Sequence, residues 1–198
     1  ARVEGLSEDQ PTKTRSGRAL TFVTLTALYF AQGLPFGFFA IAVPVLLRRA
    51  GVSLEKVGLS SLLALPWSAK FLWAPLGDRI APGRFGRRKK LIVPMQLGAS
   101  AVLLGISLVP PSASRITVLL AGFFLVSAMS ATQDIGTDGL ALDLLAPADR
   151  GLANGIQVGA YRVGMIAGGG GILYVLASRG FADGFRLMAL LTIATTIP

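Results

Sequence analysis

Long apolar runs limit what this chain can fold into more than any other feature. A helix that crosses a bilayer needs about 20 mostly apolar residues, and the sequence contains five such runs and the start of a sixth. The predicted spans are residues 19–47, 57–76, 91–109, 116–145, 152–177 and 185–198, after a tail at 1–18. The first run is longer than the core of a signal peptide, so we expect it to stay attached. We therefore expect an all-α, polytopic membrane protein that continues beyond Pro198, where the sixth span is still too short to cross.

The composition agrees with this fold class and removes several kinds of chemistry. The chain is 53% hydrophobic and 15% charged, and its net charge of +9 comes from Lys and Arg that cluster between the apolar runs. Positive charge in that pattern sets orientation in a membrane, so it does not indicate nucleic acid. The absence of Cys and His removes disulfides, thiolate metal sites, haem ligation and histidine-dependent nucleophiles. We expect no metal, no cofactor and no nucleic-acid partner, and the lipid bilayer is the first partner expected.

The distribution of Lys and Arg predicts the orientation, because short cytoplasmic connections carry the excess of positive charge. Eleven of these residues lie on the side of the N-terminus and of the second and fourth connections, and six lie on the other side. We therefore expect the N-terminus to be cytoplasmic. Much of the difference comes from the connection at residues 79–90.

Five charged residues fall inside the first five predicted spans, where a charge costs at least about 2.5–3.5 kcal/mol and normally has a partner or faces a wet cavity. At 1.5 Å per helical residue, Lys70 and Asp138 lie roughly 10 and 12 Å from the cytoplasmic ends of their spans. Arg162 and Asp134 lie roughly 16 and 18 Å from those ends. Depth thus predicts the pairs Lys70 with Asp138 and Arg162 with Asp134. The two aspartates share a polar helix face, to which Asp143 need not belong.

Simpler explanations of these charges stay open at this point. Lys70 can extend its amine to the headgroups while Asp138 and Asp143 lie at the interface. Asp134 and Arg162 can also form a fixed internal ion pair that only helps assembly.

The first span contains a polar amide beside a helix interruption. Pro35 removes one backbone hydrogen bond from the ladder, and Gln32 lies one turn before it. Irregular backbone inside a membrane is tolerated where protein or a wet cavity surrounds it. This favours a first span that lines a pathway, and the alternative is a simple proline kink against neighbouring helices.

Glycines in the fifth span predict close packing. They repeat every four or five residues, which gives a smooth face for another helix. The repeat is formed by Gly151, Gly155, Gly159, Gly164 and Gly168. The run at residues 168–171 loosens the helix, because glycine has the largest backbone entropy cost. A hinge that bends during transport is the alternative to a packing face.

The stretches KFLWAPLGDR and GRFGRRKK, within residues 70–90, resemble the loop between the second and third helices of the major facilitator superfamily. That signature has a Gly, then Asp-Arg, then Gly-Arg with further basic residues. The matching residues are Asp78, Arg79, Gly86, Arg87, Arg88 and Lys89. Ala74 stands where the leading Gly is usual, and residues 80–85 form a longer insertion. The resemblance implies a loop that latches two halves of a transporter together on the cytoplasmic side.

The stretches FGRRKKLIVPMQ, SATQDIGTDGLALDLLAPADRG and GAYRVGM extend the resemblance over about residues 29–171. Together they are similar to AmpG-type muropeptide permeases and the related acetyl-coenzyme A transporters. The resemblance implies a proton-driven transporter of two six-helix halves in a bacterial inner membrane. The present chain would cover most of the N-terminal half, with its last helix incomplete, and a C-terminal half would be its partner.

We expect the substrate and proton pathway to be lined by polar residues of four spans. They are Gln32, Lys70, Gln133, Asp134, Asp138, Tyr161 and Arg162. The function expected is uptake of a small anionic metabolite such as a muropeptide, with an acetyl-coenzyme A type transporter as the alternative. A non-transporting membrane scaffold derived from a transporter half is a further alternative. Asp134 and Asp138 could imitate a catalytic carboxylate pair, but nothing else catalytic accompanies them, so we expect no enzyme.

Overall fold

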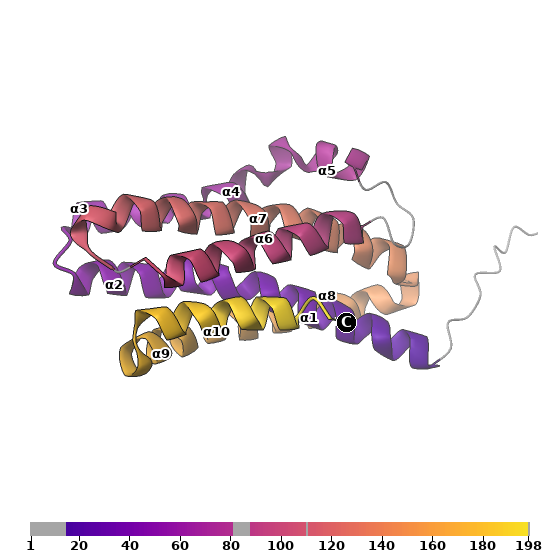
Figure 1. The fold of residues 1–198 in the computed structure, drawn as a ribbon. Coiled ribbons are helices and arrows are strands. Elements are labelled where there is room, and N and C mark those ends of the chain that lie inside the picture. Colours follow the sequence, from indigo (N-terminus) through magenta and orange to yellow (C-terminus); the bar gives the residue numbers. More distant parts are fainter. Residues whose placement is uncertain (1–14, 81–87, 110, 198) are drawn as a thin grey trace, which may run out of the picture.

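The computed structural model describes residues 15–80, 88–109 and 111–197, which form a bundle of long helices side by side (Figure 1). No strand occurs within these residues. Four helical stretches are long and apolar enough to cross a membrane, namely Gly17–Arg49, Lys89–Ser107, Ile116–Leu144 and Pro147–Arg179. The predicted fold class, an all-α polytopic membrane protein of the transporter-half type, is confirmed.

The long stretches are built from the following elements. The first contains α1 (Arg15–Gly37), the π-helical η1 (Phe38–Ala42) and α2 (Val43–Arg49). The third and fourth spans are α6 (Lys89–Ser107) and α7 (Ile116–Leu144). The fifth contains α8 (Arg150–Ile166), the π-helical η6 (Ala167–Gly171) and α9 (Ile172–Arg179), and α10 (Phe181–Ala194) follows it. Short 3-10 turns precede α7 and α8, at η4 (Ala113–Arg115) and η5 (Pro147–Asp149).

Successive spans run in opposite directions, so their connections alternate between two ends of the bundle (Figure 1). The first end holds the start of α1, the start of α6 and the connection from α7 to α8. The second end holds the connections that follow α2, α6 and α9. The start of α1, the start of α6 and the connection from α7 to α8 therefore share one end, in agreement with the alternation on which the charge count rests. The assignment of that end to the cytoplasm stays a prediction.

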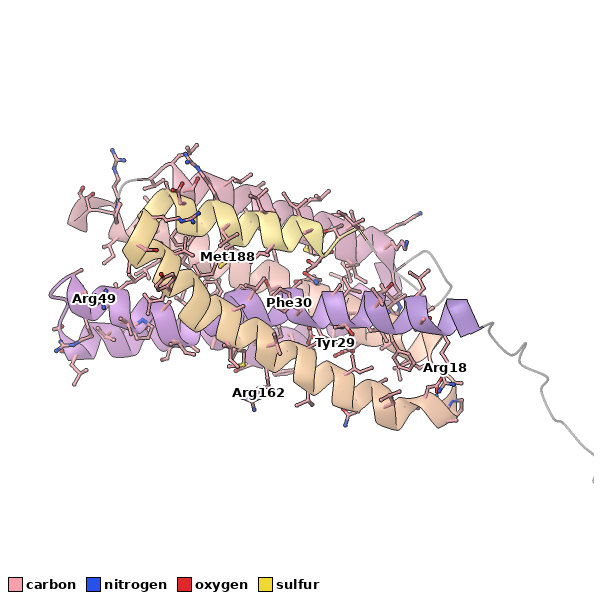
Figure 2. The ribbon with its side chains drawn as sticks, turned by 90° about the horizontal axis from the view of Figure 1, so that it is seen from below. Arg18, Tyr29, Phe30, Arg49, Arg162 and Met188 are labelled. Carbon is pink, nitrogen blue, oxygen red and sulfur yellow. The ribbon has the colours of Figure 1, made fainter. Side chains whose placement is uncertain are left out.

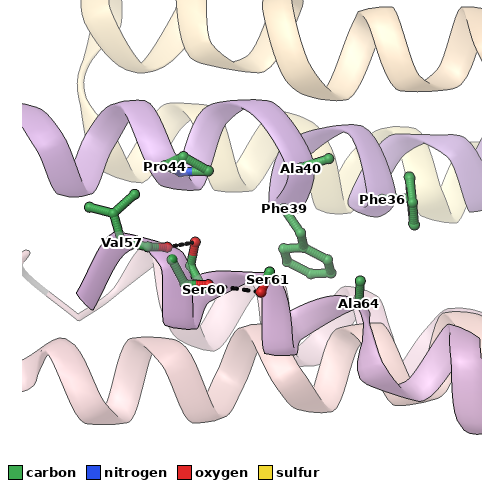
Figure 3. Close-up of a pocket in the computed structure, with 9 residues that line it drawn as sticks. Phe36, Phe39, Ala40, Pro44, Val57, Ser60, Ser61 and Ala64 are labelled. Carbon is green, nitrogen blue, oxygen red and sulfur yellow. Dashed lines mark hydrogen bonds between the residues drawn. The ribbon is translucent and has the colours of Figure 1, made fainter. Parts of the chain in front are cut away.

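The second span differs from the continuous helix expected at residues 57–76. It alternates between α-helical and 3-10 turns in five pieces. They are α3 (Leu54–Leu59), η2 (Ser60–Ala64), α4 (Leu65–Ala69), η3 (Lys70–Leu72) and α5 (Ala74–Ile80). Pro66 has no N–H and hinders a regular helix in the preceding turn. Ser60 and Ser61 donate to the carbonyls of Val57 and Gly58 at 2.7 and 2.8 Å, which further binds the backbone to local side chains (Figure 3).

Side chains of α7 hold this irregular span in place. In the 3-10 pattern the carbonyl of Leu63 would accept from residue 66, which is a proline, and the hydroxyl of Ser127 donates to that carbonyl instead at 2.5 Å. The indole N–H of Trp73 donates to the hydroxyl of Thr132 at 3.2 Å. The irregular backbone is therefore compensated by polar groups on α7, as a membrane interior requires.

Glycines allow α1 and α8 to pack closely. A Cβ on Gly33 or Gly37 would overlap the backbone at Tyr161 or Met165, and one on Gly164 or Gly168 would overlap the carbonyl of residue 30 or 34. The predicted packing role is therefore present at Gly164 and Gly168. It was wrong for Gly151, Gly155 and Gly159 within the described chain, because a Cβ there meets no atom within 4 Å.

The two π-helical segments, η1 and η6, contact each other. η1 follows Pro35 by three residues, and η6 is the glycine run that the sequence predicted to be loose. Beside them lies an apolar core in which the rings of Phe38, Phe123 and Phe185 contact one another with centroids 5.2–5.6 Å apart. An aromatic and aliphatic core therefore lies beside the two π-helical segments.

Candidate functional site

A polar cavity lies at the middle of the bundle, between α1, the second span, α7 and α8. Its volume is about 510 Å³. It is lined by Tyr29, Gln32, Phe36, Trp67, Lys70, Asp134, Asp138, Asn154, Gln157, Val158, Tyr161, Arg162 and Met165. Six of the seven residues predicted for the pathway are therefore brought together, and Gln133 is not among the lining residues.

Lys70 links both aspartates of α7. Its amine donates to Asp134 in an ion pair and lies 4.0 Å from the Asp138 carboxylate. The side chain of Asp134 is 8% exposed, against 33% for Lys70 and 44% for Asp138. The hydroxyl of Tyr29 donates to Asp138 at 3.1 Å. A nearly buried carboxylate therefore has a cation beside it, while the second carboxylate shares that cation and opens to the cavity.

Arg162 is not the partner of Asp134 that depth predicted. It lines the cavity, its side chain is exposed, and it makes no ion pair within residues 15–80, 88–109 and 111–197. Figure 2 shows it on the side of α8 that faces away from Met188. The depth of a residue in its span does not show toward which neighbouring helix its side chain points. The Lys70 side chain is also long enough to reach across the one turn that separates Asp138 from Asp134.

Three aromatic rings form the wall of the cavity toward the second end. Phe36 lies 5.7 Å from Trp67 and 5.8 Å from Tyr161 between ring centroids, and Trp67 lies 6.1 Å from Tyr161. The amine of Lys70 lies 5.9 Å from the Trp67 ring. The three rings come from three different spans, so their contacts join α1, α4 and α8 at this level.

The cavity continues toward the first end and is bounded toward the second. A hollow at the first end shares four of its lining residues, Tyr29, Asp138, Asn154 and Gln157. Toward the second end lies an apolar pocket between η1 and η2, and Phe36 is the one lining residue that the two hollows share (Figure 3). In this conformation the charged residues are therefore accessible from the first end.

Two glutamines of the predicted pathway lie in different surroundings. Gln32 is 1% exposed and lines the cavity, and neither atom of its side-chain amide has a hydrogen-bond partner among the described residues. Gln133 is also buried, and its amide nitrogen has no partner in the same part of the chain. Of these two glutamines, only Gln32 is among the residues that line the cavity.

The basic loop is described in part. Gly86 and Arg87 lie outside the described residues, as does the side chain of Asp78, and Arg79 is exposed in α5. Arg88 is buried and donates to Asp143 at 3.3 Å. Asp143 is thus separate from the cavity, as its position off the polar face indicated, and the latch function of the loop stays a prediction.

Several lining residues were not predicted from the sequence. Tyr29 lies one turn before Gln32, and Gln157 and Asn154 lie one and two turns before Tyr161 on the same face. Helical spacing from the residues already chosen would have found these three. Trp67 lies three residues before Lys70, so the same spacing would have found it as well.

The fold and the cavity define a polytopic helical membrane protein with a charged central cavity. The chain belongs to the acetyl-coenzyme A transporter 1 family, which matches residues 21–186. The relationship inferred from the loop and helix motifs is thereby confirmed at the level of family.

Similar proteins include relatives from bacteria and yeast. An uncharacterised protein of Haemophilus influenzae is 38% identical over 152 residues, which is 75% of this chain and 35% of the relative. The anhydromuropeptide permease of Escherichia coli K12 is 31% identical over 175 residues, 87% of this chain and 35% of the relative. An uncharacterised protein of Schizosaccharomyces pombe is 33% identical over 180 residues, 88% of this chain and 34% of the relative. The chain spans about a third of the length of these relatives.

Proposed function

We propose that the protein containing this chain is a secondary active transporter that takes up an anionic metabolite together with protons. The observation that carries the proposal is the group formed by Lys70, Asp134 and Asp138 in the middle of an apolar bundle. Charges at such depth are costly and usually mark an ion or substrate pathway. A second six-helix half, from the same chain or a separate one, would close the open side of the cavity.

The arrangement supports a coupling step based on exchange of partners. Lys70 makes an ion pair with Asp134 in the described state. If a substrate anion or a helix movement withdraws the amine, a carboxylate left alone in a low-dielectric cavity binds a proton more readily. Asp138 lies 4.0 Å from the same amine and can compete for it. Proton binding and the movement of Lys70 are linked in this scheme.

The proposal is tested by uptake into proteoliposomes that contain the full-length protein. An inward proton gradient should produce accumulation of a radiolabelled substrate above equilibrium, and dissipating the gradient should abolish it. Absence of gradient-dependent accumulation for every anionic metabolite tried, with correctly inserted protein, would refute proton-coupled transport.

Arg162 is proposed to hold an anionic group of the substrate. A guanidinium is always charged and offers a planar pair of donors, which suits carboxylate and phosphate groups. We expect Arg162→Lys to weaken substrate binding about tenfold although the charge is kept, because the paired hydrogen bonds are lost. Equilibrium binding of labelled substrate would measure this. Arg186→Lys, at the exposed ion pair with Asp183, is the matched control and should bind normally.

Two substrate classes have support from the comparisons. A muropeptide is favoured by the similarity to an anhydromuropeptide permease, and an acetyl-coenzyme A type substrate by the family description. Direct uptake of each labelled compound distinguishes them, since only the true substrate should accumulate, and the unlabelled form of the other should compete only at high concentration.

We also propose that the first end of the bundle is cytoplasmic and that the membrane is a bacterial inner membrane. The excess of Lys and Arg at that end supports this orientation. In intact cells a membrane-impermeant thiol reagent should label Ser53→Cys, at the second end, and should leave Ala148→Cys, at the first end, unlabelled. The opposite pattern would reverse the orientation.

A further inference from the structure

An apolar hollow, the second-end hollow, lies between helices at the second end of the bundle. Its volume is about 400 Å³, which lies within the range of small-molecule sites. It is lined by α2, α7, α9, α10 and the connections that follow α2 and α6, and Ser112 is the one described lining residue with a polar side chain. The exposed lining residues are Ala50, Pro111 and Ser112, so the hollow opens among these connections. It shares no described lining residue with the central cavity and is therefore a separate site.

The turn that ends α2 places a cation beside this hollow. Gly51 has a φ of +76°, and its N–H donates to the carbonyl of Arg48 at 3.1 Å. The N–H of Val52 donates to the carbonyl of Leu47 at 3.0 Å, which completes the pattern that commonly closes a helix at a left-handed glycine. The Arg48 side chain then donates to the carbonyl of Val52 at 3.1 Å. Because Leu47 and Val52 both line the hollow, the guanidinium is held against the backbone at its edge.

Arg48 retains most of its hydrogen-bonding capacity. A guanidinium has five N–H donors, and the bond to Val52 uses one of them. Arg48 is exposed and makes no ion pair with the side chains that the structure describes. Its planar fork suits phosphate and carboxylate groups, so an anion can bind to it at the edge of the hollow.

The second end carries more positive charge than membrane orientation explains. Its cations are Arg48, Arg49, Lys56, Arg115, Arg179 and Arg186, and its acids are Glu55 and Asp183. Asp183 is already paired with Arg186, and Figure 2 shows Arg49 at this end. If the first end is cytoplasmic, the orientation rule accounts for the Lys and Arg of the first end only. The cations of the second end attract anions to the opening of the hollow.

We propose that the second-end hollow binds one acyl chain of an anionic phospholipid, with the lipid phosphate on Arg48. An apolar hollow with a guanidinium at its edge requires a ligand that is both apolar and anionic. α2 ends beside the hollow, where a spanning helix leaves the membrane, and phospholipids present both groups there at high local concentration. The hollow is separate from the central cavity, so this inference does not depend on the proposed transport function.

The volume of the hollow favours an acyl chain over a polypeptide segment. An α-helix with its side chains is about 10–12 Å across and rises about 5.4 Å per turn, so a volume of about 400 Å³ holds about one turn at most. An unbranched acyl chain is thinner and gains free energy with each CH₂ group that it buries. Once bound, it would contact α2 and α9, which follow the π-helical segments η1 and η6, and would hold these two helices together.

The test uses a photoactivatable phosphatidylglycerol that carries a diazirine in one acyl chain. The full-length protein is reconstituted in phosphatidylcholine vesicles that contain a small fraction of this lipid, and labelled residues are mapped by mass spectrometry after illumination. We expect label on Leu119 and Phe123, which line the hollow and are 7% and 5% exposed. Val118, in the same helix but outside the hollow and 60% exposed, is the reference for lipid around the bundle.

A phosphatidylcholine with the same photoactivatable chain is the comparison lipid. It should label Leu119 and Phe123 about tenfold less, relative to Val118, because the arginines of the second end repel its choline cation. Arg48→Gln should lower the labelling by phosphatidylglycerol about tenfold as well, since a charge-assisted hydrogen bond to the phosphate is lost. Arg49→Gln is the matched control, because it removes the same charge from the next exposed residue, which makes no hydrogen bond to a described lining residue. Its labelling should be unchanged.

Three results would overturn the inference. The first is equal labelling of Leu119 and Phe123 by the two lipids in the parent protein, or label confined to Val118, and neither requires a variant to fold. The second is an equal loss of labelling in Arg48→Gln and Arg49→Gln, which would show that the general charge of the second end acts and that Arg48 does not hold the phosphate. The third is stronger labelling by a photoactivatable fatty acid than by phosphatidylglycerol, which would assign the hollow to a free acid.

Discussion

Asp134→Asn is expected to abolish accumulation driven by a pH gradient, to the level of protein-free liposomes, while exchange of substrate down its own gradient continues. Asparagine keeps the size of the side chain but cannot bind or release the proton. Lys70 would keep Asp138 at 4.0 Å, so the cation is not left without a carboxylate and the protein should still insert. The effect should therefore fall on coupling rather than on folding.

The measurement compares two assays on the same proteoliposomes: uptake under an imposed pH gradient, and exchange of labelled for unlabelled substrate at equal pH. Asp183→Asn is the matched control, because Asp183 is exposed at the second end and pairs with Arg186. Full gradient-driven accumulation by Asp134→Asn would show that the aspartate is a structural partner of Lys70.

Gly168→Ala should strongly destabilise the bundle by separating α1 from the fifth span. The added methyl group would overlap the backbone carbonyl of Leu34, which cannot move without shifting the first span. Overpacking of this kind typically costs about 1–3 kcal/mol, and helix association in membranes depends on such close contacts. We expect a lower melting temperature in detergent and less folded protein.

Gly105→Ala provides the comparison. Gly105 lies in α6, and a Cβ there meets no atom within 4 Å. The same chemical change should be neutral or stabilising by up to about 1 kcal/mol, since alanine favours a helix over glycine. Equal stability of the two variants would contradict close packing of η6 against α1.

Sequence patterns predicted the class of fold and most of the cavity, because both depend on the free-energy cost of placing polar or charged groups inside a membrane. An apolar run of sufficient length predicts a membrane span whichever helices pack against it. A charge inside a span must be compensated, so Lys70, Asp134 and Asp138 could be chosen before their neighbours were known. The family assignment drew on the same residues, because the motif around Asp134 contains both aspartates.

The pairing of charges could not be predicted in the same way. The sequence gives only the depth of each charged residue along its span. Lys70 and Arg162 differ in depth from Asp134 by distances that a flexible side chain can bridge. The direction of Lys70 depends on the 3-10 turn η3, in a span that was predicted to be regular. The unlike surroundings of Gly155 and Gly168 could not be predicted either, because regular spacing along a helix does not show where a neighbouring helix comes into close contact.

The two π-helical segments have a mechanical consequence. A π-helical turn contains one residue more than an α-helical turn. The first and fifth spans therefore each contain one extra residue, at η1 and η6, between the cavity and the second end. If the extra residue migrated along either helix, the segment that it passed would rotate by about 100° and advance about 1.5 Å. Because η1 and η6 touch, such a slip in one would displace the other. The second-end segments of the first and fifth spans would then rotate together, while Gln32 and Tyr161 kept their positions at the cavity.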